Sequence, residues 1–259
     1  MRSVTAARGG KGITVKTFGR SDQGLVRSEN QDDFLIRPVE NGGYLVAVAD
    51  GIGGGPAGRR ASHLALTTLD NAVGLLVSDV SRLTSAFSLA NRTIFAMGQD
   101  NPVLEGMGTT LTAAVLYPDR LLLAHVGDSR AYRIAQDQII RLTMDHSVAG
   151  EMERAGTITA QEASEHPKRH VLTRALGPFD KVRVDVADMP WTPGDLLLLC
   201  TDGLTSVVPD EEILRMCMAY SGEDLIDHLI GGALGRGGPD NVTVVVAVDN
   251  AGAGETDGR

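Results

Sequence analysis

Residues 44–58 read YLVAVADGIGGGPAG, an apolar run that ends in Asp50 and continues into glycines. Because the run does not alternate apolar with polar residues, it is typical of a strand covered on both faces. A carboxylate at the end of such a strand is suited to a metal ion, whereas a glycine-rich turn before a helix can cradle a phosphate. The rest of the sequence has to separate these two interpretations.

Strand patterns and helix patterns occur in blocks. Strand-like runs cover 13–18, 33–39, 44–50, 109–117, 120–127, 129–134, 138–142, 182–187, 195–202 and 241–248. Helical periodicity covers about 57–97, with a break near Ser78, and two shorter segments at about 209–219 and 222–235. A doubly wound sheet would alternate strands and helices one by one. The blocks instead predict an α+β fold, a four-layer αββα sandwich of two packed antiparallel sheets flanked by helices.

The 259 residues carry no linker-like composition, so we expect one domain over 13–249. We expect residues 1–12 to be a flexible N-terminal segment and 250–259 a disordered tail. The net charge of -9 argues against a nucleic-acid partner, and no apolar run is long enough to cross a membrane. The two cysteines are too few for a disulfide framework, which favours a cytoplasmic location. A monomer is the default expectation.

Five aspartates stand at the ends or beginnings of the apolar runs: Asp32, Asp50, Asp128, Asp202 and Asp240. Aspartate is also an ordinary turn residue, but the same acid beside so many apolar strands predicts a shared rim. Two carboxylates about 4 Å apart repel by roughly 4 kcal/mol at an effective dielectric of 20. They must therefore bind protons or cations.

An all-oxygen donor set favours Mg²⁺ or Mn²⁺, because the sequence holds no CxxC, HxxH or HExxH spacing. Two such ions that share a water can make it a nucleophile and hold a phosphoryl group for in-line attack. Arg27, five residues before Asp32, is the best candidate to bind the phosphate oxygens, although an exposed arginine can equally be a plain surface residue.

Eight segments, in order, resemble the bacterial branch of the metal-dependent type 2C protein phosphatases: DQGLVRSENQDDF, VADGIGGG, GMGTTLTAAVL, AHVGDSRAYRI, LTMDHSV, HPKRHVLTRALG, LLLCTDGLTSVV and GGPDNVTVVVA. They extend over about 16–248. The resemblance implies a β-sandwich flanked by helices and a binuclear Mn²⁺/Mg²⁺ centre. It further implies removal of phosphate from phosphoserine and phosphothreonine in proteins, opposed to a serine/threonine kinase.

The resemblance also implies roles for particular residues. Asp50 would bridge the two metals, the carbonyl of Gly51 would bind one, and Asp202 and Asp240 would complete the other. A third metal, where present, would use Asp128 together with Asp202.

Outside the metal ligands, the resemblance implies that Asp32 acts through coordinated water and that Arg27 binds the substrate phosphate. Residues 145–170 would form a mobile flap beside the site that helps to select substrates. Two departures stand out. Gln31 replaces the usual glutamate, and no histidine occurs at 52–55 to protonate the leaving group, so coordinated water is the more plausible acid. His63, on the helix that follows, is expected to be structural.

Two other interpretations remain open at this point. Gly53, Gly55 and Gly58 spell GxGxxG, and Asp79 follows at the distance where a dinucleotide-binding fold places its ribose-binding acid. That reading leaves the other aspartates without a role. A phosphatase-like module that binds phosphoproteins without turnover is the second, but it would be marked by loss of metal-site aspartates, and all five are present. Arg59 and Arg60 after Gly58 exclude a P-loop.

Overall fold

The computed structural model describes residues 2–10, 13–74 and 77–249. Its strands are β1 (Arg2–Gly10), β2 (Ile13–Asp22), β3 (Asp32–Pro38), β4 (Tyr44–Ile52), β5 (Gly108–Thr109), β6 (Leu111–Leu116), β7 (Arg120–Val126), β8 (Arg130–Ala135), β9 (Gln138–Arg141), β10 (Asp185–Pro190), β11 (Leu196–Cys200) and β12 (Val242–Asp249). Its helices are α1 (Gly55–Val73), α2 (Val80–Asp100), α3 (Val148–Arg154), α4 (Ala160–Glu165), α5 (Asp202–Thr205), α6 (Asp210–Ala219) and α7 (Gly222–Leu234), with short 3-10 turns at Glu40–Gly42 and Pro102–Leu104. None of the helices described is long and apolar enough to span a membrane.

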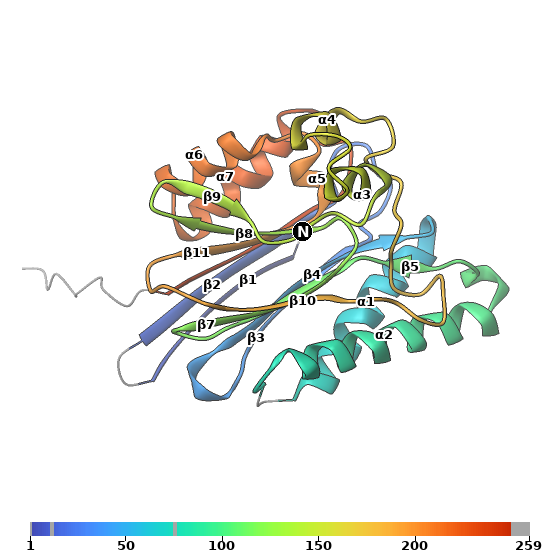
Figure 1. Cartoon of the computed structure of the whole chain (residues 1–259), viewed down its shortest axis with the longest axis horizontal. Helices are drawn as coiled ribbons and strands as arrows, with labels where there is room; N and C mark the ends of the chain where they lie inside the picture. Colours follow the sequence, from blue (N-terminus) through green and yellow to red (C-terminus); the bar gives the residue numbers. More distant parts are fainter. Residues whose placement is uncertain (1, 11–12, 75–76, 250–259) are drawn as a thin grey trace, which may run out of the picture.

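The strands form two sheets in which every pairing is antiparallel. One sheet has the order β1-β2-β12-β11-β8-β9, and the other has the order β10-β7-β6-β4-β3, with β5 paired to β4. Figure 1 shows α1 and α2 on the outside of the second sheet and α6 and α7 on the outside of the first. The predicted αββα sandwich is confirmed.

The opening run, β4, is apolar throughout because both of its faces are covered. Tyr44, Val46 and Val48 pack in the core between the sheets, and Leu45, Ala47 and Ala49 pack in the core under α1 and α2. Side chains alternate between the faces of a strand, so a strand between two cores needs apolar residues at every position. A third core lies between the first sheet and α7.

One expectation was wrong. Residues 1–12 were expected to be flexible, but Arg2–Gly10 form the edge strand β1, which pairs with β2 from Arg2↔Ser21 to Gly10↔Ile13. The composition does not indicate strand β1, because an edge strand is held by backbone hydrogen bonds to one neighbour and does not require an apolar run. The tail predicted at 250–259 lies outside the described residues.

The glycines after Asp50 shape a turn between a strand and a helix in an antiparallel sheet. Gly53, Gly54 and Gly55 all have positive φ, at 124°, 68° and 51°, a conformation that favours glycine. The dinucleotide-binding interpretation is wrong. The described part of 72–79 contains the end of α1 and a loop, where that fold needs a second parallel strand.

Candidate active site

The fold brings the five predicted aspartates to one rim of the sandwich. Asp32 and Asp50 lie opposite each other in the β3–β4 pairing. Asp128 lies in the short loop between β7 and β8, Asp202 begins α5 just after β11, and Asp240 precedes β12. The negative charges of the other four aspartates all act on Asp50. The predicted shared rim is therefore present.

Asp32 is one of the two buried carboxylates around Asp50, the other being Asp128. Burial, followed by the charges of Asp202 and Asp240, raises the pKa of Asp32 to about 7, although hydrogen bonds to hydroxyls oppose this. Thr201 donates its hydroxyl to Oδ2 over 2.7 Å, while Oδ1 is buried without a hydrogen-bond partner. A buried acceptor with no donor is costly, so Oδ1 is suited to a water or a cation.

The pKa values of Asp50 and Asp128 are also raised well above the ordinary value. Burial is the main cause for both, followed by Asp32 and Asp202 for Asp50 and by Asp202 and Asp145 for Asp128. The described residues contain no three acid, histidine or cysteine side chains already arranged as a closed coordination sphere. The fit to a divalent ion rests instead on the oxygen donor set and on its unbalanced negative charge.

The backbone around Asp50 is held firmly. Thr110 accepts a hydrogen bond from the Asp50 amide through its hydroxyl at 2.9 Å, and its own amide donates to the Asp50 carbonyl at 2.9 Å. A Cβ at Gly51 would stand 2.3 Å from the carbonyl oxygen of Gly58 and 2.8 Å from that of Gln31. Only glycine fits at this position, where the carbonyl was predicted to bind a metal.

Arg27, the predicted phosphate-binding residue, lies beside Asp240 on the same rim. Its Nη2 donates to Oδ2 of Asp240 over 2.7 Å, while its side chain is 54% exposed. The hydrogen bond to Asp240 raises the pKa of the guanidinium, and the charges of Asp50 and Asp202 contribute. The remaining donors of the guanidinium face solvent, where a phosphate dianion could approach.

Gln31 stands where glutamate was expected, but its side chain acts here as a hydrogen-bond donor and not only as a source of oxygen. Its amide Nε2 donates to the carbonyl of Gly55 over 2.6 Å and to Glu29 over 3.1 Å. The side chain thus ties the loop before β3 to the beginning of α1. An uncharged amide can make these two donations, whereas a glutamate at this position could not.

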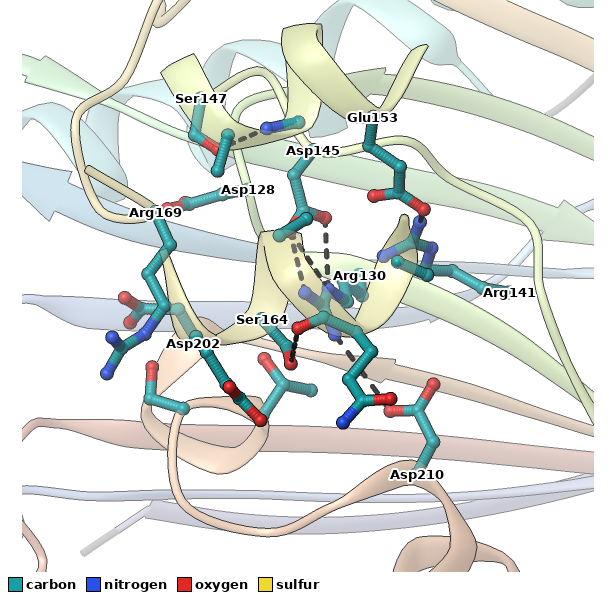
Figure 2. A pocket seen from close by; sticks show the side chains of 18 of the residues that line it. Asp128, Arg130, Arg141, Asp145, Ser147, Glu153, Ser164, Arg169, Asp202 and Asp210 are labelled. Atoms are coloured by element: carbon teal, nitrogen blue, oxygen red, sulfur yellow. Dashed lines mark hydrogen bonds and ion pairs between the residues drawn. The ribbon is translucent and has the colours of Figure 1, made fainter. Parts of the chain in front are cut away.

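The predicted flap over 145–170 contains α3 and α4 and closes over one side of the rim. Between the flap and the α5–α6 segment lies a cavity of about 700 Å³, lined by residues that include Asp128, Arg169 and Asp202 (Figure 2). At its base Asp145 accepts hydrogen bonds from Arg130 at 2.7 and 3.0 Å. The flap also contacts the rim, because its last residue, His170, lies beside Asp202.

Two residues at the site, Asn241 and His170, were not predicted from the sequence. Asn241 donates through its side chain to the carbonyls of Gln23 and Glu29 and accepts from the amide of Gln31, which fixes the Arg27 loop. His170, at the end of the flap, lies 3.2 Å from Oδ2 of Asp202. Asn241 adjoins a predicted ligand, which is a usable signal, but His170 is distant in sequence from every aspartate of the rim.

A rim of carboxylates beside an arginine, at one edge of an αββα sandwich, is suited to divalent ions and to a phosphate group. The family model described as Protein phosphatase 2C matches residues 25–227. The serine/threonine phosphatase stp of Listeria innocua is 38% identical over 240 residues, which cover 89% of this chain and 94% of that protein.

Solved structures agree with this match. The Mycobacterium tuberculosis serine/threonine phosphatase PstP/Ppp has a TM-score of 0.81 at 38% identity, covering 90% of this chain and 98% of that chain. A structure of the catalytic domain of PstP in complex with two manganese ions has a TM-score of 0.81 at 36% identity, covering 92% and 99%. The chain belongs to the protein phosphatase 2C family, and the predicted family is confirmed.

Proposed function

We propose that this phosphatase removes phosphate from phosphoserine and phosphothreonine in proteins, using the aspartate rim and Arg27. The observation that carries the proposal is the convergence of Asp50 with four other aspartates, next to an arginine whose free donors face solvent. Family membership supports a metal-dependent enzyme that acts on phosphoproteins. The residue assignments within the site are our own.

Each part of the rim then has a role. Asp50, Asp202 and Asp240, with the carbonyl of Gly51, would hold two divalent ions, and Asp128 with Asp202 would hold a third. When bound, such ions supply a nucleophile from water at neutral pH and neutralise the charge of the phosphate.

Asp32 and Arg27 act beside those ligands. Asp32, with its unpartnered Oδ1, would orient a water within the rim. Arg27 would hold two phosphate oxygens in the planar geometry of its guanidinium and so align the ester for in-line attack.

Mn²⁺ or Mg²⁺ is the proposed metal, and a monomer in the cytoplasm that reverses a serine/threonine kinase is the proposed setting. The oxygen-only donor set of the five aspartates supports these ions over Zn²⁺. Cys200 and Cys217 are both free thiols, which is compatible with a reducing compartment.

The deciding experiment is hydrolysis of an aryl phosphate and a phosphothreonine peptide with Mn²⁺, with and without a chelator. We expect turnover of both substrates with Mn²⁺ and none with the chelator. Peptide binding without any metal-dependent turnover would identify a binding module instead. Comparing Mn²⁺ with Mg²⁺ at equal concentration would show which ion the site prefers.

A further inference from the structure

The loop that carries Arg27 also exposes two consecutive aliphatic side chains. Leu25 is 68% exposed and Val26 is 69% exposed. Single exposed apolar residues are common on protein surfaces and need no explanation. Within the described residues, however, these two are the only exposed large hydrophobic residues that are adjacent in sequence.

Their exposure does not come from a loosely held loop. The amide of Leu25 donates to the carbonyl of Gly238 over 2.8 Å, and the side chain of Gln23 donates to the carbonyl of Arg27 over 2.7 Å. Gly24 has a φ of 76°, and a Cβ there would stand 2.2 Å from the carbonyl oxygen of Asp240. The loop is therefore fixed against the segment 238–240 and holds both side chains in water.

The pair is continuous with the candidate active site. Leu25 lies two residues from Arg27, so their Cα atoms are at most about 7 Å apart. A peptide whose phosphate is held by Arg27 would place one of its neighbouring residues within reach of this loop. Two side chains are far too small for a stable protein interface, which needs about 800 Å² on each partner, but they suit one residue of a peptide.

We propose that Leu25 and Val26 form an apolar contact for the residue immediately next to the phosphorylated serine or threonine, so that the enzyme favours aliphatic neighbours. This proposal rests on the proposed function. An aliphatic neighbour would cover apolar surface that is now in water. An acidic neighbour would gain no such contact, because its charged carboxylate would stay in water.

The test uses the full chain with Mn²⁺ and a double variant, Leu25→Asn with Val26→Thr, which keeps side-chain shape but adds polar atoms. Phosphothreonine peptides that differ only in a leucine or a serine at the position before or after phosphothreonine are compared through kcat/KM. For the wild type we expect the leucine peptide to be favoured on one side. In the double variant we expect that preference to fall by about fourfold to fifteenfold, as expected for the loss of one to two methylene contacts.

Two controls separate this proposal from the proposed function. Leu89→Gln changes a 40% exposed leucine on α2 and should leave the peptide preference unchanged. Aryl phosphate has no neighbouring residue, so its turnover by the wild type tests the function alone. A leucine-to-serine preference that the double variant leaves unchanged, or an equal loss for both peptides, would overturn the proposal even if the enzyme is active.

Discussion

Asp202 is the rim residue whose charge acts on three of the other rim aspartates. Its charge acts on Asp32, Asp50 and Asp128, and it is also touched by His170 of the flap. It begins α5 and is partly buried, so its side chain makes little contribution to the core. Removing this carboxylate should disturb the chemistry far more than the fold.

We therefore expect Asp202→Ala to lower kcat by about a hundredfold or more, the scale of losing one preorganised group in a site. The measurement is turnover of aryl phosphate with Mn²⁺, together with circular dichroism to show that the fold is kept. Asp188→Ala, on the exposed part of β10, is the matched control. Normal activity in the Asp202 variant would refute the proposed metal site.

His63 is the histidine closest in sequence to residues 52–55, where the family resemblance implies a histidine that acts as general acid. Its side chain is 73% exposed, and Nδ1 lies 3.1 Å from Oδ2 of Asp33, which is not one of the rim aspartates. We expect His63→Ala to change kcat less than twofold, because the exposed imidazole contacts Asp33 and none of the rim aspartates. Steady-state kinetics between pH 6 and 9 checks this, and a large fall in kcat would restore His63 as the general acid.

A largely enclosed ion pair joins two elements at the base of the flap. Asp145, just before α3, meets Arg130 of β8, and their side chains are 13% and 16% exposed. Burial raises the pKa of Asp145, but the charge and hydrogen bonds of Arg130 outweigh it, so the pKa is lowered. The carboxylate is thus held in its charged form.

Removing Asp145 leaves Arg130 with the longer 3.9 Å ion pair to Asp210. We therefore expect Asp145→Ala to lower the free energy of unfolding by about 3 kcal/mol, the lower end of the cost of breaking a buried pair. Urea denaturation gives this value, and Asp188→Ala should leave the midpoint almost unchanged because its pair with Arg120 is exposed. Equal midpoints for the two variants would show that the Arg130 pair does not stabilise the flap base.

A buried histidine links strands β6 and β7 to the same flap base. His125 is 2% exposed, its Nδ1 lies 2.9 Å from the Thr112 hydroxyl, and its Nε2 has no partner. Burial, with help from His146, lowers the pKa of His125 to about 3, while Asp145 and Asp185 oppose the shift. His125 is therefore neutral in the folded protein throughout the physiological range.

The unfolded chain binds a proton at His125 near pH 6.5, whereas the folded chain does so only near pH 3. The unfolded state therefore binds more protons between these values, and stability falls as the pH drops below about 6.5. We expect the stability advantage of the wild type over His125→Gln to shrink by about 1 kcal/mol between pH 7 and pH 5.5. Urea midpoints at the two pH values test this, and a constant difference would contradict it.

At the scale of the whole molecule, the rim is a source of repulsion that a divalent ion would relieve. An ion that binds the folded chain alone stabilises it by about 2.7 kcal/mol at a concentration of a hundred times its Kd. We expect Mn²⁺ to raise Tm by several degrees over the chelated protein, and Asp202→Ala to lose most of that rise. Differential scanning calorimetry measures both, and an equal rise in the variant would place the ion elsewhere.

Much of the molecule was predictable because its signals are local. The apolar runs predicted the strands. The aspartates beside them predicted the rim, since strand ends in a sandwich meet along common edges. Edge strand β1 was missed because backbone pairing leaves little trace in composition. The contact between His170 and Asp202 was missed because it depends on how the flap folds back across 32 residues of sequence.

The position of β12 has a consequence for how the protein is made. Although β12 is the last strand described, it lies inside its sheet between β2 and β11, and Asn241 beside it holds the Arg27 loop in place. Contacts between residues so far apart in sequence form late and slowly. On a ribosome, the arginine loop and Asp240 cannot meet until residue 241 has emerged. A nascent chain therefore cannot form its phosphate site before residues 240 and 241 have been synthesised, and fragments that end before them have an incomplete rim.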